Sequence, residues 1–132
     1  MTLSPALSAL ADESFVSLTT FRRSGVGVST PVWISRDGTE LIVTTPRKSG
    51  KVKRLRNDPR VTLVPCDRRG RVKEGAAVVE GSARIVSDEE TVERLGKVFA
   101  RKYRLEYRVF LFIEGIVTRG DRTRVMLRIS DR

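Results

Sequence analysis

The sequence predicts a mainly β fold, an antiparallel barrel with peripheral helices, from two observations. Six segments rich in β-branched and aromatic residues follow one another along the chain, and turn signals join several of them as consecutive hairpins. Such connections favour an antiparallel barrel over a doubly wound parallel sheet. The 132 residues are enough for a single domain, expected at 1–132, whose core needs neither a disulfide nor a metal to stay folded.

The first part of the chain is expected to form a short helix and a three-stranded meander. Ser4 is a typical helix N-cap and Pro5 is favoured at the first helical position. Asp37-Gly38 is a strong hairpin signal. Pro31 has no N–H to donate, so it must lie at an edge, at a bulge or where the ladder opens. The expected elements are a helix at 4–12 and strands at 14–22, 26–35 and 40–45.

The second part adds a short basic helix, three strands and further helices. Val52 and Leu55 are three residues apart, so both can face the core from the basic helix. Gly81 is expected to form a bulge, and Ser87 to Glu90 form a capping box that opens a helix. The expected elements are helices at 50–57, from 87 onward and at about 105–117, and strands at 60–66, 76–86 and 123–129.

The positive charge is concentrated in one window. The chain has a net charge of +10, and residues 47–73 contain eleven basic and two acidic side chains, a net charge of +9. A solvated basic face that keeps the protein soluble is one interpretation. The other is an anion site for a nucleic-acid backbone, an acidic membrane or a phosphorylated cofactor.

The residue types that are missing exclude several chemistries. The chain has no histidine and one cysteine, Cys66, which excludes imidazole triads, zinc sites with histidine ligands and an intramolecular disulfide. We expect Cys66 to be a buried structural thiol rather than a nucleophile. No motif has catalytic or metal-binding spacing, so we assign no catalytic residue and no metal ligand. If the protein is an enzyme, we expect a bound cofactor to carry the chemistry that these side chains cannot.

No segment predicts contact with the interior of a membrane. None of the apolar runs approaches the ~20 residues of a membrane helix. The first 15 residues have no basic stretch, and Asp12 and Glu13 interrupt them. We therefore expect a cytoplasmic protein with no signal peptide and no membrane insertion.

The strand end and helix start around residue 50 form a candidate phosphate site. Amide groups and the dipole at a helix start favour an anion, and a glycine lets a phosphate approach the backbone closely. Hydroxyl groups can donate hydrogen bonds to it, and ammonium groups add charge. The candidate residues are Thr44, Thr45, Lys48, Ser49, Gly50 and Lys51.

A second candidate feature is the segment Thr30 to Trp33, which contains the only tryptophan. Backbone groups freed at Pro31 could hydrogen-bond a heterocycle, and Val32 or Trp33 could flank its flat face. A tryptophan in the core of a barrel strand is the alternative interpretation.

Taken together, these segments resemble the split-barrel flavin and deazaflavin proteins related to pyridoxamine 5′-phosphate oxidase. The narrower resemblance is to the actinobacterial branch of coenzyme F420-dependent enzymes, and it covers about residues 10–130. No single motif is diagnostic, but their order and spacing are fairly specific. The matching segments are Phe15 to Thr20, Thr30 to Trp33, Leu41 to Thr45, Ser49 to Lys51, Arg54 to Arg60, Pro65 to Gly70 and Val79 to Ala83.

The resemblance implies a six-stranded split barrel that works as a homodimer with cofactor sites at the interface. It implies that Thr30, Pro31, Val32 and Trp33 line the flavin or deazaflavin ring, that Thr44 and Thr45 contact the cofactor, and that Ser49 and Lys51 hold its phosphate. Flavin-phosphate oxidases carry a basic residue where this chain has Gly50, which favours coenzyme F420 over FMN. The histidine of some related substrate sites is absent, so pyridoxal chemistry is not carried over.

Three functions remain open from the sequence. The first is an oxidoreductase that moves a hydride between reduced deazaflavin and a small unsaturated acceptor. The second is a protein that binds deazaflavin, FMN or haem without turnover. The third is a nucleic-acid binder, which is disfavoured because Trp33 is the one aromatic residue near the basic window and the helix at 50–57 is short for a groove reader.

Overall fold

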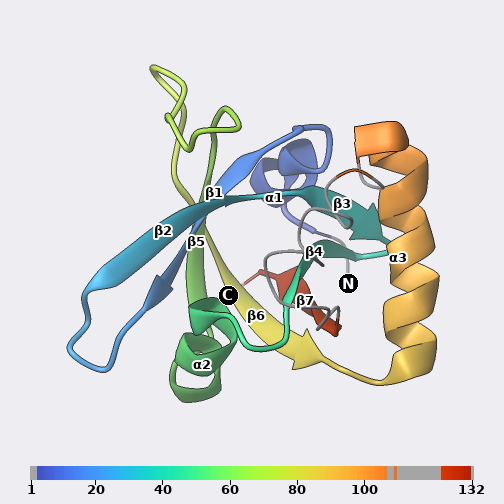
Figure 1. The fold of residues 1–132 in the computed structure, drawn as a ribbon. Helices are drawn as coiled ribbons and strands as arrows, with labels where there is room; N and C mark the ends of the chain where they lie inside the picture. Colours follow the sequence, from blue (N-terminus) through green and yellow to red (C-terminus); the bar gives the residue numbers. More distant parts are fainter. Residues whose placement is uncertain (1–2, 107–108, 110–122, 132) are drawn as a thin grey trace.

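The computed structural model describes residues 3–106, 109 and 123–131, and it shows a strongly curled antiparallel sheet with three helices around it (Figure 1). The strand order is β2-β1-β5-β6-β7-β4-β3, and every neighbouring pair is antiparallel. The elements are α1 (Pro5–Leu10), β1 (Val16–Phe21), β2 (Gly27–Val32), β3 (Ile34–Asp37), β4 (Glu40–Pro46), α2 (Gly50–Asn57), β5 (Arg60–Pro65), β6 (Val79–Val86), α3 (Glu89–Tyr103) and β7 (Arg124–Ser130). The mainly β split barrel predicted from the sequence is confirmed.

The two edge strands of the sheet, β2 and β3, are separated in the chain by one residue, Trp33. The sheet must therefore curl until its opposite edges meet, and Trp33 lies at the seam. The expectations of one strand over 26–35 and of six strands are wrong, because the chain breaks at Trp33 and the described residues form seven strands. Pro31 does lie on an edge strand, where it pairs with Ser17 of β1 and leaves no donor missing from a central ladder.

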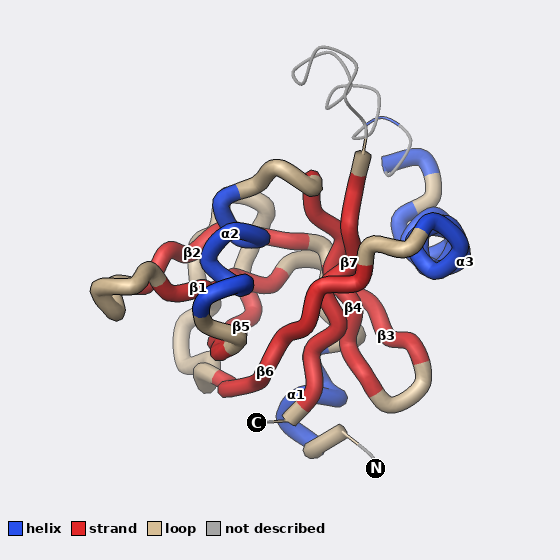
Figure 2. Tube along the Cα trace, turned by 90° about the horizontal axis from the view of Figure 1, so that it is seen from below, coloured by secondary structure: helices blue, strands red, loops and turns tan. Residues whose placement is uncertain are grey.

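Two apolar clusters hold the sheet together. The larger one fills the barrel and includes Leu18, Leu63 and Leu127, while Leu7 of α1 and Leu55 of α2 close it from the ends. The smaller one lies between α3 and the outer face of β4 and β7. Its buried members are Ile42, Leu95, Phe99, Tyr103 and Met126. Strands β4 and β7 are therefore buried on both faces. Figure 2 shows α3 and α2 on opposite sides of the strands.

Local signals predicted most helix and hairpin positions correctly. The Ser4 hydroxyl caps α1 by accepting a hydrogen bond from the Leu7 amide at 3.3 Å. The basic helix spans the predicted residues 50–57, with Val52 and Leu55 buried. Gly38, at φ +62°, makes the tight hairpin between β3 and β4. No helix among the described residues is both long and apolar enough to cross a bilayer.

Two local expectations are wrong and one falls largely outside the described residues. Gly81 stays in register with Val61, and no bulge forms; a Cβ there would lie 3.0 Å from the Ser130 carbonyl oxygen, so close packing against β7 requires the glycine. The N-cap of α3 is Asp88, not Ser87, and its carboxylate accepts from the Thr91 amide. Of the helix expected at 105–117, only 105, 106 and 109 are described.

Two side chains in the last turn of α3 join Ile34, next to Trp33, to the α1–β1 connection. The Lys102 ammonium donates to three carbonyl oxygens, those of Ala11, Glu13 and Ile34, at 2.6–2.7 Å. The Tyr103 hydroxyl accepts from the Ile34 amide at 3.0 Å and donates to the Ser14 carbonyl at 2.8 Å. Burial raises the pKa of Tyr103 to about 12, so the hydroxyl keeps the proton that it donates. Backbone groups on the open edge of β3 are thus paired by side chains of α3.

A charged cluster fixes the other end of β3. The Asp37 carboxylate binds Arg94 of α3 and Arg128 of β7, at 3.2 and 2.7 Å. Glu40 binds Arg84 and Arg128. The hydrogen bonds from Arg94 and Arg128 lower the pKa of Asp37, so the carboxylate stays ionised at neutral pH.

Replacing Lys102 with methionine should destabilise the protein strongly, because carbonyl groups near the seam lose their donor. We expect Lys102→Met to lower the free energy of unfolding by about 2–3 kcal/mol, measured by urea denaturation. Lys97→Met, at an exposed position of the same helix, should change it by less than about 0.5 kcal/mol. Equal effects of the two substitutions would show that the three hydrogen bonds of Lys102 do not hold the seam.

Candidate functional site

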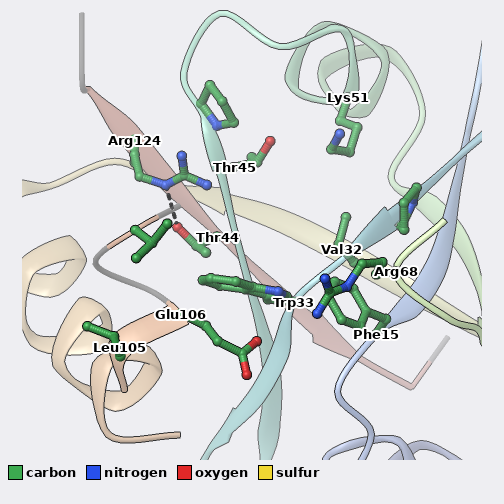
Figure 3. Close-up of a pocket in the computed structure, with 13 residues that line it drawn as sticks. Phe15, Val32, Trp33, Thr44, Thr45, Lys51, Arg68, Leu105, Glu106 and Arg124 are labelled. Atoms are coloured by element: carbon green, nitrogen blue, oxygen red, sulfur yellow. Dashed lines mark hydrogen bonds between the residues drawn. The ribbon is translucent and has the colours of Figure 1, made fainter. Parts of the chain in front are cut away.

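A cavity of about 630 Å³ opens at the seam, and we call it the main cavity (Figure 3). Six elements or connections contribute to it: the start of β1, the β2–β3 seam, the end of β4, the start of α2, the β5–β6 loop and the start of β7. Residues after α3 complete the described wall. The lining residues are Phe15, Pro31, Val32, Trp33, Thr44, Thr45, Pro46, Lys51, Arg68, Leu105, Glu106, Val109 and Arg124.

Trp33 gives the main cavity a flat aromatic wall. Its ring stacks on Tyr103 with the centroids 4.3 Å apart and an interplanar angle of 10°. Because Tyr103 is itself held by Ile34 and Ser14, the orientation of the indole is fixed before any ligand binds. A rigid aromatic surface of this kind suits a flat heterocycle. The tryptophan is half-buried rather than enclosed in the core.

Positive charge gathers beside this wall, at the start of α2. Burial lowers the pKa of Lys51, and the guanidinium groups of Arg54 and Arg124 lower it further. In the part of the chain that the structure describes, no carboxylate pairs with the Lys51 ammonium. An ammonium group that two guanidinium groups repel, and that has no paired carboxylate among the described residues, would be stabilised by a bound anion.

Threonine hydroxyls hold the two arginines in place. Arg54 Nε donates to Thr20 Oγ1 at 2.7 Å, and Arg124 Nε donates to Thr44 Oγ1 at 2.8 Å. Thr44 uses an oxygen lone pair in this contact, so its hydroxyl hydrogen is not consumed by it. Arg54 is therefore held by a neutral hydroxyl group, and the Thr44 hydroxyl is one of the groups that position Arg124.

The start of α2 presents further donors. Ser49 is the N-cap residue, but its side chain makes no capping bond to the helix. Its hydroxyl instead lies 3.1 Å from that of Thr45. The first turn of α2 contains no acidic residue, so the positive end of the helix dipole is not offset there. Both features leave the helix start suited to an external anion.

The structure brings six of the ten candidate residues to the main cavity: Pro31, Val32, Trp33, Thr44, Thr45 and Lys51. Four others do not line it. The Thr30 hydroxyl is buried without a partner in the described structure, and Lys48 is exposed. Ser49 reaches the site only through Thr45. A Cβ on Gly50 would lie 2.7 Å from Arg54 Nη1, so this glycine makes room for the arginine.

Sequence reasoning missed the lining residues that come from distant parts of the chain. Arg124 enters the site because it pairs with Pro46 across β4 and β7, a register that no local signal reveals. Phe15, Arg68 and Glu106 come from the ends of elements and from a loop. A weak signal for Arg68 was available, since it belongs to the basic window 47–73.

Cys66 is buried, as expected, and lies outside the main cavity. Burial raises the pKa of its thiol, with the Asp67 carboxylate adding to the shift, so the nucleophilic thiolate is disfavoured. Within the described ranges, no group of three or more acidic, cysteine or histidine side chains could hold a metal ion.

Solved structures with the same fold have several recorded roles. A conserved hypothetical protein of Mycobacterium tuberculosis is 26% identical, with a TM-score of 0.69 over 100% of this chain and 82% of that one. An F420 reductase is 20% identical, with a TM-score of 0.60 over 98% and 96% of the two chains. The heme storage protein HutZ of Vibrio cholerae is 11% identical, with a TM-score of 0.65 over 100% and 92%. The last two likenesses show the fold alone.

The sequence comparison identifies the family. None of the curated proteins compared with the chain gives a significant match. The sequence profile of pyridoxamine 5′-phosphate oxidase matches residues 4–130, nearly the whole chain. With its curled antiparallel sheet and the cavity at the seam, the chain belongs to the pyridoxamine 5′-phosphate oxidase family, a split-barrel family that includes flavin-binding oxidoreductases.

Proposed function

We propose that the protein binds a deazaflavin, coenzyme F420, in the main cavity and passes a hydride between the reduced cofactor and a small unsaturated acceptor. The observation that carries this proposal is the uncompensated cation at Lys51, next to Arg54 and Arg124, at one side of a cavity with a fixed aromatic wall. An anionic cofactor with a flat ring needs both features together. FMN is the alternative cofactor.

Each part of the cofactor has a matching region. The ring would lie along Pro31, Val32 and Trp33, and the phosphate would lie near Lys51 and Thr45 at the start of α2. When bound, the cofactor supplies the hydride chemistry. The protein residues orient the ring, neutralise the phosphate and exclude water from the apolar wall. This proposal assigns no acid–base residue.

The basic surface around α2 favours the deazaflavin over FMN. Coenzyme F420 carries a phosphodiester and a glutamate tail, and so has more negative charge beyond the phosphate. Lys48 and Lys53 are exposed near the start of α2 and could meet such a tail. Long-range attraction of this kind depends on salt.

Storage of haem without turnover is less well supported. Haem iron is commonly held by histidine, cysteine or methionine. The chain has no histidine, and neither cysteine nor methionine is among the described residues that line the main cavity. Binding of a flavin or deazaflavin without turnover remains the competing function, and turnover assays separate it from the proposed one.

The cofactor test compares coenzyme F420 with FMN. We expect F420 to bind more tightly in low salt, because its tail meets the basic surface, and the difference to narrow as salt screens the charges. Absorption spectra and fluorescence quenching at two salt concentrations measure this. Equal affinities at low salt would contradict the choice of F420, and no binding of either would refute the proposed function.

Lys51→Ala should weaken cofactor binding about 10- to 150-fold, since a charge-assisted contact contributes about 1.5–3 kcal/mol and 1.4 kcal/mol is tenfold. The fold should survive, because Lys51 is repelled by Arg54 and Arg124. Lys53→Ala removes the same charge from an exposed position of α2 and should have a several-fold smaller effect. Equal losses of cofactor affinity in the two variants would mean that the basic residues attract the cofactor through their summed charge, with no specific phosphate contact at Lys51.

We also propose a homodimer with cofactor sites at the interface. Leu105 and Val109 line the main cavity although 71% and 49% of their surface is exposed, so one chain leaves apolar parts of the wall uncovered. A two-fold symmetric partner would cover them. Light scattering at micromolar concentration should give the mass of two chains. A monomer that still binds cofactor would rule the dimer out.

A further inference from the structure

Arg68 lines two cavities. A second cavity of about 500 Å³, which we call the outer cavity, lies between the α1–β1 connection and the β5–β6 loop. Its lining residues are Asp12, Glu13, Ser14, Phe15, Cys66, Asp67, Arg68, Arg69 and Lys73. The two cavities share Phe15 and Arg68, so the Arg68 side chain borders both of them.

The loop that carries Arg68 is braced on several sides. The Asp67 carboxylate accepts from the Arg69 and Arg71 amides at 2.8 and 3.0 Å, and these bonds lower its pKa. Gly70, at φ +84°, lies against Pro31 of the seam. The backbone that carries Arg68 is therefore fixed, while its side chain is exposed to solvent.

The charge of Arg68 is not compensated by the chain. Asp67 is occupied by backbone amides, and Glu13 of the outer cavity is paired with Lys73 at 2.6 Å. In the described part of the molecule, the Arg68 side chain has no hydrogen-bond or ion-pair partner. The described lining of the main cavity contains three basic residues and one acidic residue, Glu106, so the wall as a whole attracts anions.

Arg68 is set apart from the cations assigned to the cofactor phosphate. Figure 3 shows its guanidinium beside Phe15, across Trp33 from Arg124, while Lys51 projects from α2. A cofactor with its phosphate at Lys51 and its ring along Trp33 would leave Arg68 to contact a different anionic group. The neighbouring surface is aromatic and flat, which suits a conjugated molecule.

We propose that Arg68 binds the carboxylate of the acceptor and so makes the enzyme selective for flat unsaturated carboxylic acids. This inference rests on the proposed function. In the reduction, the C=C π bond of the acceptor would break, its β-carbon would gain a hydride from the reduced deazaflavin and its α-carbon a proton from water. The oxidised cofactor would release its remaining proton, which neutralises the hydroxide left from that water. The carboxylate keeps its charge throughout, so Arg68 acts as a specificity-determining residue that orients the acceptor.

The test uses cinnamate and cinnamamide, two flat molecules that differ in charge. Their dissociation constants are measured by calorimetry on the full chain, with and without cofactor. We expect the native protein to prefer cinnamate about fivefold, equivalent to about 1 kcal/mol, because the ion pair is partly exposed. Arg68→Gln should abolish the preference and Arg68→Lys should keep part of it. Arg69→Gln, a change in an exposed arginine of the same loop that lines only the outer cavity, should retain it.

The outcomes separate this inference from the proposed function. No preference in the native protein, no binding of either molecule, or the same preference in Arg68→Gln would overturn the role of Arg68, even if cofactor binds normally. A loss of F420 affinity in Arg68→Gln that grows with the number of glutamates in the tail would assign Arg68 to the cofactor instead. Failure of the native protein to bind any cofactor would refute the proposed function, and the cinnamate preference would still be measured on the cofactor-free chain.

Discussion

The backbone amide and carbonyl groups of Ile34 are paired by side chains rather than by a neighbouring strand. Ile34 lies on the open edge of β3, where no strand follows to pair with its amide and carbonyl groups, and leaving such groups unpaired in a buried position costs about 1–3 kcal/mol each. Tyr103 and Lys102 pair them from the end of α3. The same two side chains donate to carbonyl groups before β1, so one helix turn joins β3 to the α1–β1 connection.

The cavity follows from how the seam is closed. The edge strands β2 and β3 are not hydrogen-bonded to each other, so the sheet does not close completely, and Trp33 lies between them. Tyr103 fixes the indole by stacking, which means that the residue that stabilises the fold also orients the proposed ring-binding wall. Stability and binding are therefore linked through one tyrosine, and the site is built before a ligand arrives.

Positive charge lies in two separate places around the main cavity, near Lys51 and at Arg68. The arginines near Lys51 are held by threonine hydroxyls, and the turn before Arg68 is held by backbone amides. The Thr20 hydroxyl holds Arg54 without cancelling its charge. In the Asp37 cluster, by contrast, each arginine contacts a carboxylate and the charges stabilise the fold. Two separate cationic regions flank a flat wall, an arrangement that fits two anionic groups on two different molecules.

Features that depend on neighbours along the chain could be predicted from the sequence. Signals within a few residues predict the Asp37-Gly38 hairpin, the helix at 50–57 with Val52 and Leu55 inside, and the basic segment beside Thr44 and Thr45. Local signals did not predict the break at Trp33, the close packing at Gly81 or the positions of Arg124 and Arg68 in the site. Each of these depends on which strands become neighbours and on how far the sheet curls, because pairing register and side-chain closure at the seam join residues up to 91 positions apart in the chain.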